Sequence, residues 1–280
     1  MSMAQKVVEA RNAAKIDPVL NFREMLAHWE LFTLLTRKEL KIKYKGSALG
    51  FMWSLLNPLL FMMVYAVVFS SIFNTSSIPG IKSYVVYLLS GLIPWNVLAA
   101  SVGAAPTLLL SNSNIIKKVY FPSELIPLAN VAANVINFLL SQIVLVIIVI
   151  ALGVYPGVSL IVFPLATLCL GLFVGGIVLL IASLNVYFRD IEHFVQILVM
   201  MWFFLTPIVY ARSQVHRHLL QLWFKINPMT WIIGMFQAIW AENTWPHLDW
   251  IYGSVGLSTV VFLLGLYVFW KLKLHFAEEL

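Results

Sequence analysis

The sequence predicts an all-α integral membrane protein with six transmembrane helices. Of its 280 residues, 61% are hydrophobic and only 11% are charged, whereas a soluble domain carries roughly 25% charged residues. Long uncharged runs alternate with short charged segments, and most runs approach the ~20 residues that cross a hydrocarbon layer. From these runs we expect spans at about 51–73, 83–105, 125–152, 160–184, 194–210 and 250–270.

Residues 1–50 are expected to form a cytoplasmic segment before the first span. Residues 1–20 lack the continuous apolar core of a cleaved signal peptide. Over 21–32, apolar residues recur at helical spacing and charged residues take the other side, which predicts an amphipathic helix. Such a helix lies in the membrane interface or against a soluble partner. The basic stretch 37–45 that follows it favours the interface.

The distribution of Lys and Arg orients the spans. The basic stretch 37–45 runs directly into the first span, and positive charge stays on the cytoplasmic side of a membrane. With this orientation, most of the 18 Lys and Arg residues fall on cytoplasmic segments. Both termini are therefore expected in the cytoplasm, with 51–271 as the six-span domain and 272–280 as a cytoplasmic tail.

Two stretches interrupt the simple pattern of spans. Turn residues at 153–157 divide one long uncharged run into the third and fourth spans. The apolar segment 226–241 is short for a span, so we expect a re-entrant or interfacial segment there. Irregular backbone at membrane depth needs protein or a cavity around it. This segment is therefore expected to pack over the outer mouth of the space that the spans enclose.

Several kinds of chemistry are missing from the sequence. The six predicted spans carry no Asp, Glu, Lys or Arg in their middle, which disfavours an ion-coupled transporter and a membrane enzyme. Cys169 is the single cysteine, and the pair His216 and His218 has no third ligand nearby, so no metal site is expected. The sequence has no phosphate-binding loop motif for ATP.

Two spans carry side-chain stripes at helical spacing. Trp53, Asn57, Phe61 and Tyr65 follow one another at intervals of four in the first span. The third span has a polar stripe that includes Asn130 and Asn134. Polar stripes either bond neighbouring helices or line a polar path, and aromatic stripes either pack or line a channel; the sequence leaves both pairs open. Gly171 and Gly175 predict a close approach of two helices.

An ordered series of motifs carries a family resemblance. Residues 35–60 read LTRKELKIKYKGSALGFMWSLLNPLL, followed by SGLIPWN, NIIKKVYFP, LNVYFRDI, TPIVY and KINPM. This series resembles the permease subunit of ABC-2 type polysaccharide exporters, which handle O-antigen, teichoic acid and related glycans. The resemblance implies a six-span subunit that pairs with a second copy of itself above two ATPase chains. It also implies short outer helices between the fifth and sixth spans.

The resemblance also assigns roles to residues. ATP and Mg would bind the partner ATPase subunits, so this chain would need no cofactor and would not be an enzyme. ATPase coupling is expected on two cytoplasmic loops, at Ile116, Lys117, Lys118, Tyr120, Phe121, Arg189, Asp190 and Glu192. Substrate-channel candidates are Trp53, Asn57, Phe61, Tyr65, Asn134, Trp202 and Tyr210, because aromatic rings suit the C–H faces of sugars. Lys41, Lys43 and Lys45 are candidates for a lipid headgroup or carrier phosphate.

The expected function is therefore the permease subunit of an ATP-driven exporter in the bacterial cytoplasmic membrane. Its substrate is expected to be a polysaccharide, lipid-linked O-antigen, teichoic acid or a similar surface glycan, with membrane lipids as further partners and no nucleic acid. One alternative is an ABC-2 type permease for a drug or another small amphipathic molecule. A third reading, a membrane transferase, would need a buried acid or base, for which Glu124 and Asp190 are the best candidates.

Overall fold

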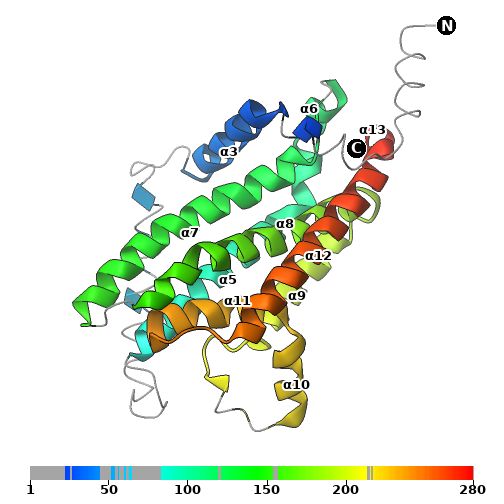
Figure 1. Ribbon diagram of the computed structural model, residues 1–280. Coiled ribbons are helices and arrows are strands. Elements are labelled where there is room, and N and C mark those ends of the chain that lie inside the picture. The colour runs from blue at the N-terminus through cyan, green and yellow to red at the C-terminus, as the bar shows by residue number, and fades with distance from the viewer. Residues whose placement is uncertain are drawn as a thin grey trace, which may run out of the picture.

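The computed structural model describes residues 23–25, 27–44, 52–53, 56, 60, 63–64, 83–118, 121–153, 157–212, 215 and 217–279. The described part of the chain is helical almost throughout (Figure 1). Most of the first predicted span lies outside the described residues, and so do four site candidates in and beside it and one in the next cytoplasmic loop. These are Lys45, Asn57, Phe61, Tyr65 and Tyr120.

Four helices in the described part are long and apolar enough to cross a membrane. They are α5 (Tyr84–Ser111), α7 (Leu125–Ala151), α8 (Phe163–Tyr187, preceded by the 3₁₀ turn Val158–Val162) and α12 (Leu248–Leu272). They fall on the segments predicted at 83–105, 125–152, 160–184 and 250–270. The prediction of an all-α integral membrane protein is confirmed at this level.

Helix α9 (Ile191–Phe204) differs from the continuous span expected at 194–210. It has 14 residues, which at ~1.5 Å per residue is shorter than a ~30 Å hydrocarbon layer. Pro207 explains where it stops, because the residue before a proline avoids helical backbone angles. The chain over 205–212 continues without an α-helix.

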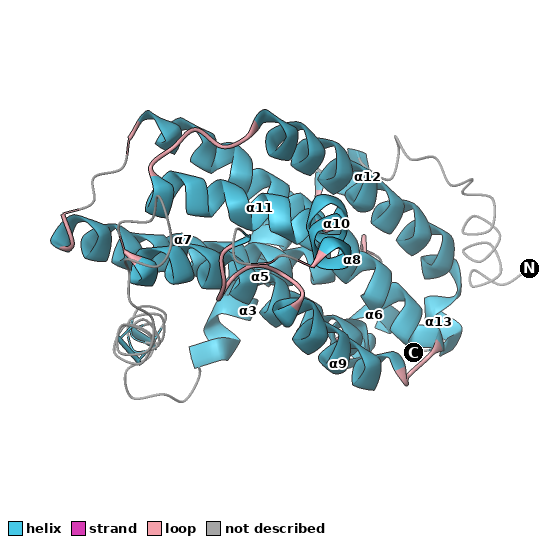
Figure 2. Ribbon diagram, turned by 90° about the horizontal axis from the view of Figure 1, so that it is seen from below, coloured by secondary structure: helices cyan, strands magenta, loops and turns pink. Residues whose placement is uncertain are grey.

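Short helices follow α9, as expected for the segment before the last span. They are α10 (His218–Ile226), α11 (Pro228–Gln237) and the π-helical turn Ala238–Glu242. Asn227 begins α11, since its side chain accepts a hydrogen bond from the Met229 amide, and Pro228 suits the first helical position. Helix α11 is almost wholly buried and packs against α12, α5 and α8 (Figure 2).

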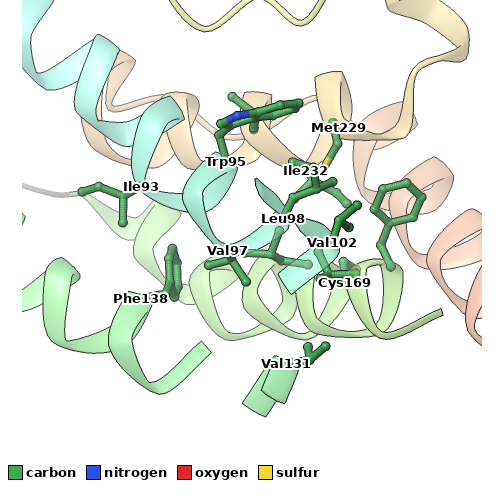
Figure 3. Close-up of a cluster of buried hydrophobic side chains, with 14 of the residues drawn as sticks. Ile93, Trp95, Val97, Leu98, Val102, Val131, Phe138, Cys169, Met229 and Ile232 are labelled. Atoms are coloured by element: carbon green, nitrogen blue, oxygen red, sulfur yellow. The ribbon is translucent and has the colours of Figure 1, made fainter. Parts of the chain in front are cut away.

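Helix α5 lies at the centre of the bundle, in contact with α7, α8, α9 and α11. It is apolar on every side, which is typical of a helix that is buried all round. Its side chains form one cluster with those of its neighbours (Figure 3). The members labelled there include Trp95, Leu98 and Val102 of α5, Phe138 of α7, Cys169 of α8, and Met229 and Ile232 of α11.

Helices α8 and α12 approach each other closely at a pair of glycines. A Cβ atom on Gly176 would lie 2.5 Å from the Val261 carbonyl oxygen, and one on Gly265 would lie 2.9 Å from the Gly176 Cα. The prediction placed the close approach at Gly171 and Gly175. A Cβ at Gly171 would be 3.9 Å from its nearest neighbour, whereas one at Gly175 would lie 3.3 Å from the Phe262 ring of α12. The close approach is therefore found at Gly175, and the backbones themselves meet at the neighbouring Gly176.

Helix α3 (Trp29–Tyr44) begins within the predicted amphipathic segment 21–32, continues through most of the basic stretch 37–45, and packs along α7 (Figure 1). At the other end of the chain, α12 continues into the 3₁₀ turn Lys273–His275 and α13 (Phe276–Glu279). Phe276 is buried and its ring lies 5.4 Å from that of Phe269. The C-terminal residues are therefore part of the packed fold.

Candidate coupling and transport sites

Both predicted coupling loops lie at one end of the bundle, which we call the α6 end (residues 112–124, 188–192 and 270–279). Helix α6 (Ser113–Lys118) follows α5 and leaves Lys117 and Lys118 exposed. Ile116 and Phe121 are half-buried against the apolar core. The second loop joins α8 to α9. It exposes Arg189 and Asp190, and Glu192 is half-buried in the first turn of α9.

Glu124 is fully buried at the point where the first coupling loop enters α7. Its Oε1 atom accepts a hydrogen bond from the Trp270 indole at 2.9 Å and lies 3.3 Å from the Lys273 ammonium. Sequence reasoning considered Glu124 only as an acid for a transferase. One carboxylate oxygen of Glu124 is therefore engaged by α12, while Oε2 is buried without a hydrogen-bond partner among the described residues.

The polar stripe of α7 holds α3 against the bundle. Asn130 donates to the Glu39 carboxylate at 2.8 Å, and Asn134 donates to the Ser101 hydroxyl at 2.8 Å. The Lys43 ammonium donates to the Asn134 carbonyl oxygen. Asn134, a channel candidate, is 4% exposed, so within this chain it bonds helices together. Of the two uses that the sequence left open, these contacts support hydrogen bonding between helices.

A pocket of about 670 Å³ lies beside α3. It is lined by Leu34, Arg37, Lys38, Lys41 and Ile42. Lys38 also donates to the Asn112 side chain at 2.7 Å. Of the three lysines predicted for a phosphate, Lys41 lines this pocket and Lys43 bonds to α7. Arg37 and Lys38 belong with Lys41 here, one helical turn earlier than the sequence suggested.

The described aromatic candidates have different surroundings. Trp53 is half-buried. Trp202 lies edge-on to Trp95 and Phe173, and its indole N–H donates to Asn227 at 3.0 Å. The Tyr210 hydroxyl donates to the Phe204 carbonyl at 2.8 Å. Trp202 and Tyr210 thus lie near the short helices, and their polar atoms are engaged within the chain.

The opposite end of the bundle, which we call the α11 end (residues 84–91, 205–212 and 218–250), is held by neutral hydrogen bonds. Carbonyl groups of the irregular stretch 205–212 accept from side chains on three helices. The donors are Trp223 to Leu205, Gln237 to Pro207, Tyr84 to Val209 and Tyr87 to Tyr210. Asn227 also donates to Thr206 at 3.0 Å. These carbonyl groups of the irregular backbone are therefore satisfied inside the protein.

Arg212 is the charged residue among these contacts, and sequence reasoning counted it only as a loop charge. Its guanidinium lies 3.8 Å above the Trp250 ring and donates to the Thr230 carbonyl at 3.3 Å. Partial burial lowers the pKa of Arg212 to about 10, while Tyr87 and Glu242 raise it. Arg212 therefore remains charged at neutral pH and joins the start of α12 to α11.

The helices and the motifs at the α6 end define the class of protein. Residues 30–240 match the ABC-2 type transporter family. The chain belongs to this family, and it is a multi-pass membrane protein.

Individual relatives match over nearly their whole length. The chain is 34% identical over 255 residues to the O-antigen export system permease protein RfbA of Klebsiella pneumoniae, covering 90% of this chain and 95% of that protein. It is 30% identical over 259 residues to the protein of the same name from Myxococcus xanthus, covering 92% and 98%. The resemblance to permeases of ABC-2 type polysaccharide exporters is confirmed.

Proposed function

We propose that this chain is the membrane-spanning permease subunit of an ATP-driven exporter of a cell-surface polysaccharide. The near-full-length similarity to O-antigen export permeases carries the proposal. The same similarity favours a polysaccharide over the alternative of a drug or small amphipathic molecule. The ion-paired state of Glu124 and the transporter family argue against a membrane transferase.

The proposed topology has six spans in the bacterial cytoplasmic membrane with both termini in the cytoplasm. The α6 end is then the cytoplasmic side, and the α11 end faces outward. Lys117, Lys118 and Arg189 at the α6 end support this orientation. Re-entry of α11 is supported by its depth, because Gln237 approaches Gly91, about two turns into α5.

The proposed assembly contains two copies of this chain and two ATPase subunits that bind ATP and Mg. The coupling loops are exposed on the cytoplasmic side, where an ATPase would dock. Helix α9 supports a second copy, because it leaves much of its apolar surface uncovered. Exposed members are Phe194, Ile197, Leu198, Met200, Met201 and Phe204.

A path for the polymer is proposed between the two copies. The aromatic residues Trp53, Phe61, Tyr65 and Tyr210 remain its proposed lining, since weak repeated contacts with sugar faces suit a sliding polymer. Trp202 and Asn134 support the neighbouring helices, as their hydrogen bonds indicate.

A lipid-linked glycan is the proposed form of the substrate. The α3 pocket combines Arg37, Lys38 and Lys41 with the apolar side chains of Leu34 and Ile42. Cations beside apolar surface suit the phosphate of a lipid carrier, because the charges attract the headgroup and the apolar residues accept the chain.

A deletion strain tests the export function. Cells that lack this chain should lose the surface polysaccharide and accumulate it inside, with unchanged drug susceptibility, and the intact gene should restore the surface polymer. Normal surface polysaccharide together with altered drug susceptibility would contradict the proposal and support the drug permease.

A further inference from the structure

Both coupling loops are fastened to the same short stretch at the end of α12. The first loop leads into Glu124, which contacts Trp270 and Lys273. The second loop begins just after Tyr187, whose hydroxyl donates to the Leu272 carbonyl at 2.9 Å. The Tyr187 ring also lies 6.4 Å from the ring of Phe276. Residues 270–276 thus meet both loops, and we call them the α12 junction.

The Glu124 contact is an unusual way to hold two helices together. The carboxylate is 0% exposed, whereas the Lys273 side chain is 21% exposed. Burying a carboxylate is unfavourable without charged or hydrogen-bonding partners, and apolar residues would often hold such a site at least as stably. In some proteins, a buried charge of this kind fixes one particular partner and register and adds little stability.

The Glu124 and Tyr187 contacts both lie close to the predicted coupling residues. Glu124 lies three residues after the coupling candidate Phe121, and Tyr187 lies two residues before Arg189. Each contact therefore joins one loop to α12 within about one helical turn of the residues expected to meet an ATPase. Besides this junction, α12 packs against α8 and α11, and much of its remaining surface is exposed.

We infer that the α12 junction transmits movement of both coupling loops to α12, with Glu124 and Tyr187 as positioning residues. This inference rests on the proposed ATP-driven export. Packed side chains and hydrogen bonds carry such coupling when they connect rigid elements without a gap. Movement of an ATPase subunit against the loops would then shift α12 together with α7 and α8.

The test measures polysaccharide exported per ATP hydrolysed, using the whole complex of this chain with its ATPase in proteoliposomes. Glu124→Gln keeps the side-chain size and the acceptor for Trp270 but removes the charge that Lys273 contacts. In this variant, the amount of polysaccharide exported per ATP hydrolysed should fall at least about fivefold while ATP hydrolysis continues. Lys273→Met should lower this ratio similarly. The double variant should have no lower a ratio than either single variant, because both substitutions remove the same Glu124–Lys273 contact.

Two further variants act as controls. Lys271→Met removes an exposed charge two residues away and should leave the ratio unchanged. Lys273→Arg keeps the charge and should restore most of the ratio that Lys273→Met loses. Tyr187→Phe, which deletes a single hydroxyl group, should lower the ratio independently of Glu124. If the complex with Glu124→Gln fails to assemble, Tyr187→Phe alone tests the role of the α12 junction.

The outcomes separate the inference from the proposed function. A wild-type complex that exports no polysaccharide with ATP would refute the proposed function. Wild-type export with unchanged ratios in Glu124→Gln and Tyr187→Phe would refute the junction alone. Equal loss of export and ATP hydrolysis in these variants, or an equal fall in Lys271→Met, would also overturn it.

Discussion

Helices α5 and α12 both pack against α8, yet they are held in different ways. In an apolar stretch of 18 residues, 78% of the residues are buried in α5, whereas only 22% are buried in α12. Large apolar side chains surround α5 on all sides. Helix α12 touches α8 at Gly176 and Gly265 and is fixed near its ends by Arg212 and Glu124.

This difference separates a fixed element from an adjustable one. Side-chain interdigitation over a whole surface resists displacement, since interiors are close-packed. Helix α12 is held on one side, by its packing against α8 and α11 and by the two polar contacts near its ends, and much of its remaining surface is exposed. Within the described residues, α5 is therefore the scaffold of the bundle, and α12 is the helix whose position single substitutions can change.

The largest predicted difference in unfolding free energy is between the same substitution, leucine to alanine, in α5 and in α12. Leu98→Ala in α5 opens a cavity at a residue that is 0% exposed, and should lower the free energy of unfolding by about 3–5 kcal/mol. Leu263→Ala in α12, at a residue that is 58% exposed, should cost less than about 0.5 kcal/mol. Denaturation in mixed micelles measures both, and equal losses would remove the distinction.

The glycine contact of α12 is predicted to be the next most sensitive site. Gly265→Ala forces apart the α8 and α12 backbones and should cost about 2–3 kcal/mol in the same measurement. Gly256→Ala is the matched control, because a Cβ there meets nothing within 4 Å. A neutral Gly265→Ala would show that α12 does not depend on this close approach.

The Arg212 contact at the α11 end should contribute less. Arg212→Met removes the contact over Trp250 and the hydrogen bond to Thr230, and should cost about 1–2 kcal/mol. Arg217→Met, at an exposed position in the same segment, should leave the unfolding free energy unchanged. If the two variants behave alike, the Arg212 contacts do not fix α12.

The smallest effect is predicted for a buried serine of α12. The Ser258 hydroxyl is buried and has no hydrogen-bond partner among the described residues. Ser258→Ala should therefore change the unfolding free energy by less than about 0.5 kcal/mol. A larger loss of unfolding free energy would reveal a hydrogen bond to this hydroxyl, which would then be a third polar contact that holds α12.

Sequence patterns predicted the long helices because uncharged length and breaks are local properties. Pro207 was visible in the sequence, but its effect on α9 depends on the side chains of Tyr84, Tyr87 and Gln237 that satisfy the non-helical carbonyls. Those donors lie up to 125 residues away in the chain. The uncharged run alone therefore suggested a longer helix.

The site residues that sequence reasoning missed all depend on long-range partners. Glu124 and Trp270 are 146 residues apart, and the glycine that Gly176 meets is Gly265 on another helix. A charge directly before a long apolar run was the one local signal for Glu124. Asn130 and Asn134 were found as a stripe, and only the structure shows that α3 and α5 are their partners.

The central claim is ATP-driven polysaccharide export through this chain. Its most direct test uses proteoliposomes that contain the purified chain with its ATPase subunit, and follows labelled lipid-linked polysaccharide across the membrane. The account predicts translocation that requires ATP, Mg and both proteins, and that stops when the ATPase is omitted. Translocation by this chain without the ATPase, or ATP hydrolysis by the complete complex without any movement of polysaccharide, would contradict it.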